Sequence, residues 1–434
     1  MPSLGAYGVV LAVAAATTFA SMFLVRRLAV RVGAVVRPDE RRVHKRPTPT
    51  LGGLGMLVGL LAGMGTAWAM GSFDAIFSGS TEPLGLVLAA VLIVAVGVID
   101  DLREVSAPAK VAGIVLAASV LVISGISMLV FRVPFLGVFV LSSDWSYLLS
   151  VLWVVGMTNA INLIDGLDGL AGGIVAIAAG AFFLYSVELG DEGLLLPGNI
   201  GALVAILTLG ACLGFLPHNI HPARIFMGDG GALLLGLLMA ASTMVVGGRT
   251  ARSFSGSSFF FFAPVLIPVV ILGVPIFDML FAIVRRARSR SGISTADKGH
   301  LHHRLMRLGH GHRRSVFILW AWTALLSGFV LYPIYSGSGD GLVPFGIAAI
   351  LLSLYMLLHP GLRSSRDREN GTTTAVSGAG GVGEVASSPV AAAPPAGAAA
   401  ASDGLEPVDP AALPAVGPVS HRPARRDPGE EAAP

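Results

Sequence analysis

Eleven apolar segments, each long enough to cross a lipid bilayer, divide this 434-residue chain and restrict what it can fold into. A membrane-spanning helix needs about 20 mostly apolar residues. Only 13% of the residues are charged, whereas soluble domains carry about 25%. We therefore predict an all-α integral membrane protein with about eleven transmembrane helices. The segments lie near 4–25, 52–71, 84–99, 108–126, 145–164, 170–188, 197–216, 231–248, 259–284, 316–333 and 342–359.

The basic residues are divided unequally between the two sets of loops. Of the 29 Lys and Arg residues, only Arg132, Arg249 and Arg252 fall in loops on one side. By the positive-inside rule, we expect the N-terminus outside and the C-terminus in the cytoplasm. The polar clusters described below then all lie at the cytoplasmic face, where a water-soluble substrate meets a lipid headgroup. An ion-coupled transporter would instead hold its polar groups near the bilayer midplane.

The remaining composition limits the organisation of the chain. The single cysteine, Cys212, lies in an apolar segment and offers no intramolecular disulfide. The first apolar segment lacks a preceding basic stretch and is interpreted as a retained helix. Residues 361–434 are rich in Ala, Pro and Gly and contain no Phe, Trp or Tyr. We predict a disordered cytoplasmic tail there, after a membrane domain at 1–360. Residues 127–141 favour a short hairpin on the outer side.

The sequence MTNAINLIDGLDGLAGG, at 157–173, places four polar side chains between two apolar segments. Asn159, Asn162, Asp165 and Asp168 recur every three residues. Such side chains are costly beside lipid unless they face protein, water or an ion. A polar turn between two helices explains one Asp and the glycines. A site for a hard cation or a polar substrate explains all four side chains better.

Asp100 and Asp101 end the third apolar segment. Two adjacent carboxylates at a helix C-terminus oppose the helix dipole, so a cation or a basic partner is expected nearby. Ordinary solvated charges at the membrane boundary are the alternative. Downstream, Ser106 can cap a helix that carries Lys110 in its first turn. A lysine at a helix N-terminus suits a phosphate, although the positive-inside rule also predicts a lysine there.

In HNIHPARIFMGDGG, at 218–231, Asp229 stands where a helix N-cap belongs. The two glycines that follow it allow the backbone to approach a ligand closely. Capping and ligand binding are therefore both open for Asp229. Asn219, His221 and Arg224 stand just upstream.

The loop sequence KGHLHHRL carries His300, His302, His303 and Arg304. No cysteine or second histidine cluster offers a tetrahedral zinc site, so anionic phosphates are the expected ligand. A basic loop that attracts anionic lipid is the alternative. The sequence contains neither a P-loop nor a dinucleotide-binding glycine motif.

Five motifs together resemble a known family. KRPTPTLGG, GVIDD followed by Lys110, NAINLIDGLDGLAGG, HNIHPARIFMGDGG and KGHLHHRL occur in the order seen in the polyprenyl-phosphate N-acetylhexosamine-1-phosphate transferases, glycosyltransferase family 4. The loop HLHHRL is more similar to the WecA/TagO-like branch than to MraY. The resemblance spans about residues 37–315.

The resemblance implies an enzyme that transfers GlcNAc-1-phosphate from UDP-GlcNAc to polyprenyl phosphate and releases UMP. It also implies Mg²⁺, with Mn²⁺ as a substitute, and a place in the bacterial inner membrane with a cytoplasmic active site. A homodimer is compatible with it, and no nucleic-acid partner is expected. Another UDP-N-acetyl sugar, such as UDP-MurNAc-pentapeptide, is the alternative donor, and a transporter is the alternative from another class.

The family motifs also imply roles for individual residues. By motif position, Asn162 and Asp229 match the residues that hold the metal ion. Asp100 and Asp101 match the pair that handles the lipid phosphate, and Asp165 and Asp168 match family acids without an agreed role. Because a phosphate monoester is largely dianionic at neutral pH, we favour Asp100 as an orienting residue over a base. The substrate-binding set is Lys110, Asn159, Asn219, His300, His302, His303 and Arg304.

Overall fold

The computed structural model describes residues 2–37, 47–103, 105–133, 137–247, 270–289, 305–306, 310–336 and 341–358. The chain divides into two compact units, Met1–Val376 and Ser377–Pro434. The second unit lies outside the described residues, as does the predicted tail at 361–434. The disorder and the cytoplasmic position of that tail stay predictions. The fold below is that of the first unit.

Helices make up most of the described residues, and eight of these helices are long and apolar enough to cross a membrane. The eight are α1 (Leu4–Arg31), α2 (Gly52–Ala69), α4 (Glu82–Arg103), α6 (Ser143–Ile164), α7 (Leu170–Asp191), α8 (Gly201–Asn219), α9 (Gly228–Gly247) and α13 (Gly311–Ser336). The protein is therefore an all-α membrane protein, as predicted.

Three further helices fall on the remaining predicted segments. α5 (Ala107–Ile123) and α14 (Leu342–Leu358) are apolar but shorter. α11 (Gly273–Ser289) covers the second part of the segment predicted at 259–284, and residues 248–269 lie outside the described residues. The count of eleven crossings stays a prediction. A 3-10 turn (Gly71–Phe73) and the short α3 (Asp74–Phe77) follow α2.

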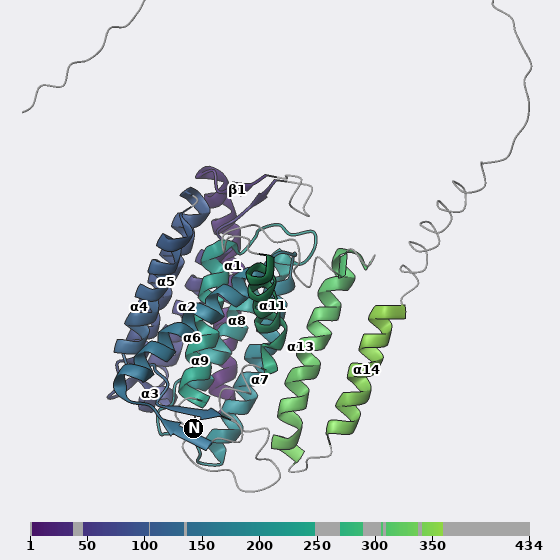
Figure 1. The fold of residues 1–434 in the computed structure, drawn as a ribbon. Coiled ribbons are helices and arrows are strands. Elements are labelled where there is room, and N and C mark those ends of the chain that lie inside the picture. The colour runs from purple at the N-terminus through teal and green to yellow at the C-terminus, as the bar shows by residue number, and fades with distance from the viewer. Residues whose placement is uncertain are drawn as a thin grey trace, which may run out of the picture. The chain divides into compact units, whose positions relative to one another are not determined.

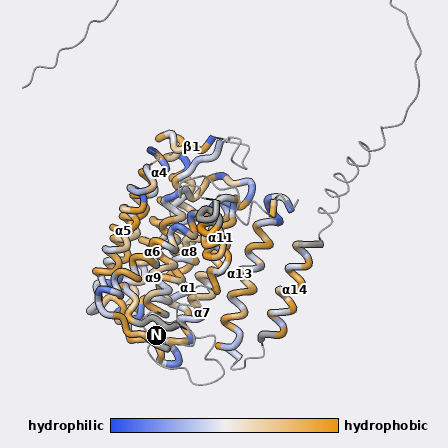
Figure 2. Tube along the Cα trace, in the orientation of Figure 1, coloured by the Kyte–Doolittle hydropathy of each residue, from blue (hydrophilic) through white to orange (hydrophobic). Residues whose placement is uncertain are grey.

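α7, α8 and α9 are the most buried of the eight long helices. The apolar stretches of α7 and α8 are each 78% buried, and that of α9 is 94% buried. α1, α2 and α7 pack on α8, while α4 and α6 pack on α9, and α13 and α14 follow on the outer side of α7 (Figure 1). Because α9 is apolar around its circumference, neighbours have to cover it on all sides. Hydrophilic residues gather towards the ends of the helices (Figure 2).

Small residues bring α1 and α8 together. A β-carbon built on Gly214 would lie 2.3 Å from the Ala15 carbonyl oxygen, and one on Gly210 would lie 2.8 Å from the Ala14 β-carbon. Small residues allow helix backbones to approach closely in a membrane, where apolar burial alone does not drive association. Any larger side chain at these two glycines would force α1 away from α8.

Two short antiparallel hairpins complete the described fold. β1 (Val35–Val36) pairs with β2 (Thr48–Pro49). β3 (Val130–Val133) pairs with β4 (Gly137–Val140), with Arg132 opposite Val138. The second hairpin confirms the prediction at 127–141, and its tip at 134–136 lies outside the described residues.

The end of the bundle that carries β1 is opposite the N-terminus (Figure 1). Backbone hydrogen bonds bring the segment before α9 to this end. The Gly52 N–H donates to the Phe226 carbonyl oxygen at 2.9 Å, and the Phe226 N–H donates to Pro49 at 2.9 Å. The start of α2, the β1–β2 hairpin and the start of α9 therefore meet, and the polar residues of the candidate site lie around this meeting point.

Candidate active site

The ends of α4 and α9 approach so closely that only glycine fits between them. Gly228 has a φ of +67°, and a β-carbon there would lie 2.3 Å from Asp101 Oδ2 and 2.4 Å from Thr50 Oγ1. A β-carbon on Gly97 would lie 2.3 Å from the Gly230 backbone nitrogen. The glycines of the GDGG motif thus allow α9 to begin directly against the acidic end of α4.

Five residues from four helices form what we call the acidic cluster: Asp100, Asp101, Lys110, Asn162 and Asp229. The Lys110 ammonium lies 2.8 Å from Asp100 Oδ2 and also forms an ion pair with Asp229 Oδ2. The other Asp100 oxygen accepts the Val105 N–H at 2.7 Å. The expectation of a basic partner for the Asp100–Asp101 pair is confirmed, and that partner is Lys110.

The sequence suggested that the Asp229 side chain caps the start of α9. In the structure Asp101 fills this role. Asp101 Oδ1 accepts the Asp229 backbone N–H at 3.1 Å, one of the N–H groups that the first turn of a helix leaves free. The Asp229 carboxylate instead contacts Lys110 and Asn162. Its position in the first turn of α9 therefore leaves its side chain directed at the cluster.

Asn162, near the end of α6, joins the same cluster. Its amide is oriented so that the nitrogen donates to Asp229 Oδ1 at 2.9 Å and the oxygen accepts from Lys110 Nζ at 3.1 Å. In this orientation the amide satisfies both of its partners, as buried polar groups generally do. Asn159, one turn earlier, donates to the Val155 carbonyl oxygen of its own helix at 2.7 Å. The structure therefore brings Asn162 to the acidic cluster, whereas the Asn159 amide nitrogen bonds within α6.

Asp165 follows the last turn of α6, between the acidic cluster and Asp168. Burial, followed by the charges of neighbouring carboxylates, raises the pKa of Asp165 to about 8. These carboxylates are Asp229, Asp101 and Asp168. A cation placed among these groups would relieve the repulsion between them.

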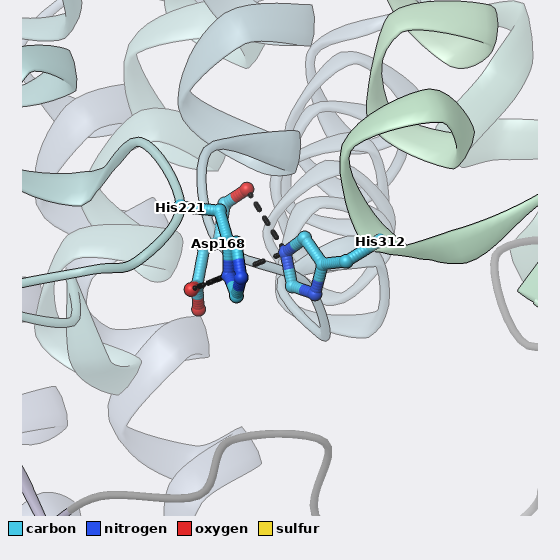
Figure 3. Close-up of side chains that lie close together, drawn as sticks. All are labelled: Asp168, His221 and His312. Atoms are coloured by element: carbon cyan, nitrogen blue, oxygen red, sulfur yellow. Dashed lines mark hydrogen bonds and ion pairs between the residues drawn. The ribbon is translucent and has the colours of Figure 1, made fainter.

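Asp168 belongs to a second group, which we call the histidine cluster: Asp168, His221 and His312 (Figure 3). Asp168 Oδ2 lies 2.7 Å from His221 Nδ1 and accepts the Ala223 N–H at 3.1 Å. His312, in the first turn of α13, lies with Nε2 4.0 Å from the same oxygen. The two imidazole rings stack with centroids 4.2 Å apart.

Asn219 connects the loop after α6 to the segment before α9. Its Oδ1 accepts the Gly169 N–H at 2.9 Å, and its Nδ2 donates to the Ile225 carbonyl oxygen at 3.0 Å. Asn219 is buried, so the contacts described for its amide are with protein backbone. His300, His302, His303 and Arg304 lie outside the described residues, and their predicted role stays a prediction.

The acidic cluster contains the oxygen ligand atoms that a hard cation requires. Asp101 Oδ2 is buried, and no described residue gives it a hydrogen bond. The Asp229 backbone contacts the other Asp101 oxygen, the Asp229 carboxylate contacts Asn162, and the Asp229 and Asp101 charges both act on Asp165. Mg²⁺ prefers oxygen ligands and usually takes only one or two protein carboxylates. The residues present therefore fit Mg²⁺ at this end of α9.

Comparison with known proteins identifies the family of the chain. The model of glycosyl transferase family 4 matches residues 83–247. A decaprenyl-phosphate N-acetylglucosaminephosphotransferase of Mycolicibacterium smegmatis is 39% identical, over 82% of this chain and 88% of its own length. The chain belongs to glycosyl transferase family 4. This family 4 enzyme is therefore a membrane-embedded transferase, and the whole acidic cluster falls within the matched residues.

Two further relatives of the family 4 enzyme have different names. A probable undecaprenyl-phosphate N-acetylglucosaminyl 1-phosphate transferase of Bacillus subtilis is 38% identical, over 71% of this chain and 78% of its own length. A phospho-N-acetylmuramoyl-pentapeptide-transferase of Desulforudis audaxviator is 33% identical, over 67% of this chain and 86% of its own length. The resemblance to this family, with the MraY-like members at lower identity, is confirmed.

No pattern in the sequence predicts that His221 and His312 lie in one cluster. His221 is 53 residues from Asp168 and His312 is 144 residues from it. Each histidine stands close to a family motif, in HNIHP and in GHGHRR. The only local signal in the sequence of the family 4 enzyme was one histidine in each of two segments that lie far apart in the chain, which does not reveal that the two rings stack.

Proposed function

We propose that the protein transfers GlcNAc-1-phosphate from UDP-GlcNAc to polyprenyl phosphate and releases UMP. The observation that carries this proposal is Lys110, held between Asp100 and Asp229 beside Asn162 at one end of the helix bundle. Relatives with this activity in their names share 38–39% identity with the chain. The reaction is the first lipid-linked step of a cell-wall or surface glycan.

The reaction exchanges one phosphoanhydride bond for another. An oxygen of the lipid phosphate attacks the phosphorus that carries the sugar and forms a new P–O–P bridge. The bond from that phosphorus to the bridging oxygen of UDP breaks, and its electron pair leaves with UMP. Phosphoryl transfer of this kind needs positioning and charge neutralisation more than covalent help from the protein.

Lys110 and Asp100 are suited to positioning. The Lys110 ammonium provides a positive charge for the substrate phosphates in the acidic cluster. It also forms ion pairs that hold Asp100 and Asp229 in position. Both Asp100 oxygens already accept hydrogen bonds, one from Val105 and one from Lys110. A phosphate monoester is largely dianionic at neutral pH, so Asp100 acts as an orienting group rather than an obligatory base.

Asp229, Asn162 and Asp101 would hold Mg²⁺. A Mg²⁺ ion held there would supply Lewis-acid stabilisation of the negative charge that develops in the transfer. Asp101 would bind α9 and the cation through different oxygens. Its Oδ1 accepts the Asp229 N–H, which leaves Oδ2 for the cation. Asp165 lies beside them, and because its pKa is raised to about 8 its carboxyl is largely protonated at neutral pH when no cation is bound.

We further propose eleven membrane crossings with the acidic cluster on the cytoplasmic side, in a bacterial inner membrane. Two matched variants in a Cys212→Ala background test this orientation. Ser80 lies exposed between α3 and α4, and Ser106 lies exposed before α5. An impermeant thiol reagent should label Ser80→Cys but not Ser106→Cys in intact cells. The reverse labelling pattern would contradict the proposed side for the site.

UDP-MurNAc-pentapeptide is the alternative donor, because the Desulforudis audaxviator relative acts on a phospho-N-acetylmuramoyl-pentapeptide by name. The higher identity to the N-acetylglucosamine relatives favours UDP-GlcNAc. A transporter is less favoured, because the acidic cluster lies at the ends of helices rather than in the middle of the bundle.

The experiment is a transfer assay with purified protein in detergent. The protein receives UDP-[¹⁴C]GlcNAc with decaprenyl or undecaprenyl phosphate, and labelled UDP-MurNAc-pentapeptide in a parallel reaction. The proposal predicts labelled lipid and UMP in equal amounts from UDP-GlcNAc. Labelled lipid from the pentapeptide donor alone would replace the proposed substrate with the alternative. No labelled lipid from either donor would contradict the proposed reaction.

A further inference from the structure

Asp168, His221 and His312 bring three metal-ligating atoms together outside the acidic cluster. Asp168 Oδ2, His221 Nδ1 and His312 Nε2 all lie within 4.8 Å of one another. They come from the loop after α6, the segment before α9 and the first turn of α13. In Figure 3 the His221 and His312 rings both turn a nitrogen towards Asp168. Among the described residues, no other group of three such side chains meets this distance.

We propose that the histidine cluster is a binding site for a divalent transition-metal ion of the zinc class. Imidazole nitrogen suits Zn²⁺ and its first-row neighbours, whereas Mg²⁺ prefers oxygen ligands. Two histidines and one carboxylate are a known ligand set for zinc, and they leave a fourth position open for water or a substrate oxygen. The site differs in chemistry from the oxygen-rich acidic cluster and does not depend on the proposed transfer reaction.

The present distances need only small adjustments to bind such an ion. Ligand bonds of about 2.1 Å in a tetrahedron place the ligand atoms about 3.4 Å apart. The Asp168 Oδ2 to His312 Nε2 distance is 4.0 Å, and the Asp168 Oδ2 to His221 Nδ1 distance is 2.7 Å. One separation has to shorten and the other has to lengthen by less than 1 Å, while the two histidine nitrogens lie within 4.8 Å of each other. Binding also requires the two stacked rings to turn so that both nitrogens point at the ion.

The surroundings support ligation by these three side chains. His312 Nε2 lies 3.4 Å from the Asp168 carbonyl oxygen, beyond the usual N–H···O range, so His312 gives up only a weak contact. The Ala223 N–H donates to Asp168 Oδ2 and fixes the direction of the carboxylate. Hydrogen bonds to a ligating carboxylate serve this orienting role in metal sites.

A bound ion would cross-link three segments that are already joined by hydrogen bonds such as the one from Arg313 to the His221 carbonyl oxygen at 3.1 Å. Asp168 stands three positions after Asp165, and His312 follows the basic loop that carries His300 to Arg304. The ion would therefore fix the end of that loop against the segment next to the acidic cluster. Without an ion, the cluster would be a structural contact in which Asp168 holds the turn at Ala223.

Direct metal binding distinguishes these two outcomes. Full-length protein in detergent, with saturating Mg²⁺ to cover the acidic cluster, is dialysed against Zn²⁺ and analysed for bound metal. Co²⁺ in place of Zn²⁺ reports the coordination through its visible absorption. The variants are His221→Gln, whose imidazole is 39% exposed, and His312→Gln. The controls are His310→Gln and a triple replacement of His300, His302 and His303 by Gln.

The proposal predicts one Zn²⁺ per chain that resists competition by Mg²⁺, with affinity weakened at least tenfold in His221→Gln and in His312→Gln. Both controls should keep that ion and the Co²⁺ spectrum of a four-coordinate site. The size-exclusion profile of each variant shows whether it is folded. If His312→Gln proves unstable, the result for His221→Gln decides, because His221 is partly exposed. Unchanged Zn²⁺ affinity in folded His221→Gln, or loss of the ion in the triple variant only, would overturn the proposal.

Discussion

The Lys110 ammonium on α5 forms an ion pair with the Asp229 carboxylate in the first turn of α9, although 119 residues separate them in the chain. Lys110 is largely buried, with 17% of its side chain exposed, and it also pairs with Asp100 at 2.8 Å. One ammonium thus compensates two carboxylates. Removing it would leave both acids in a partly buried site without a positive partner.

The Lys110→Met variant should therefore lose stability and activity together. We expect a loss of about 1–3 kcal/mol in the free energy of unfolding, because buried groups lose their partner, and a fall in transfer rate of at least about 100-fold. Thermal melting and the lipid-transfer assay measure these effects. Arg103→Met, at the exposed end of α4, is the control and should stay within about 0.5 kcal/mol of wild type.

A double variant separates charge compensation from packing. Asp229→Asn should restore part of the stability lost in Lys110→Met, because it removes one of the two uncompensated carboxylates. Equal melting temperatures for wild type and Lys110→Met would show that the ion pairs contribute nothing to folding, which contradicts the account of the cluster.

Gly228 offers a test of the close approach between α4 and α9. Gly228→Ala combines a left-handed backbone, which costs about 1–2 kcal/mol for an L-residue, with a β-carbon 2.3 Å from Asp101 Oδ2. Gly33→Ala is the matched control, because Gly33 has a φ of +78° and open space around it. We expect Gly33→Ala to lower the free energy of unfolding only by the cost of the left-handed backbone, and Gly228→Ala to lower it clearly more. Denaturation of the purified protein measures both changes.

Gly228→Ala should also abolish transfer, because Asp101 and the start of α9 would move apart. Equal destabilisation by the two replacements, with full activity in both, would mean that the α4–α9 contact does not shape the site.

The long helices were largely predictable because most of them contain a long apolar segment. The predicted segment at 145–164 is found as α6 at Ser143–Ile164, and 170–188 as α7 at Leu170–Asp191. The differences lie at the ends, where polar residues such as Asp144 and Asp191 continue the helix. Hydropathy reports which residues prefer lipid, but hydrogen bonding decides where a helix ends.

The acidic cluster was predictable only in part. Asp100, Asp101 and Lys110 are near neighbours in sequence, and the family motifs connect them to Asn162 and Asp229. The cap on the Asp229 N–H by Asp101 depends on a contact over 128 residues. No local pattern reveals which of several acids will approach a helix start, so the sequence suggested Asp229 for a role that Asp101 fills.

The contacts of Asn219 and of the histidine cluster could not be predicted from local sequence patterns either. The Asn219 amide joins the backbones of Gly169 and Ile225, which depends on how α7 and α8 pack at their ends. The site residues His300, His302, His303 and Arg304 lie outside the described residues and remain predictions from the resemblance.

The raised pKa of Asp165 predicts how stability depends on pH when Mg²⁺ is chelated. An acid whose pKa is higher in the folded than in the unfolded chain binds its proton more tightly when folded. Its contribution to stability is greatest below the unfolded pKa, near 4, and is lost as pH rises towards the folded value of about 8. Wild type in EDTA should therefore melt at lower temperature as pH rises from 5 to 9.

Asp165→Asn should flatten this dependence and should melt about 2–4 °C above wild type at pH 9, a gain of about 1 kcal/mol. Asp144→Asn, an exposed acid at the start of α6, is the control. Melting curves recorded at each pH in EDTA provide the measurement. A slope in Asp165→Asn as steep as that of wild type would show that Asp165 is not a charged group buried among carboxylates.

If the acidic cluster carries metal-dependent GlcNAc-1-phosphate transfer, product formation depends on both Mg²⁺ and the Asp229 carboxylate. Labelled lipid formed from UDP-[¹⁴C]GlcNAc is measured against Mg²⁺ concentration for wild type and Asp229→Asn, with the melting temperature of each. Asn keeps the size of Asp but lacks the charge that a hard cation needs. We expect Mg²⁺-dependent product from wild type, and a well-folded variant whose rate is at least about 100-fold lower. Near-normal turnover of Asp229→Asn at ordinary Mg²⁺ would contradict this expectation.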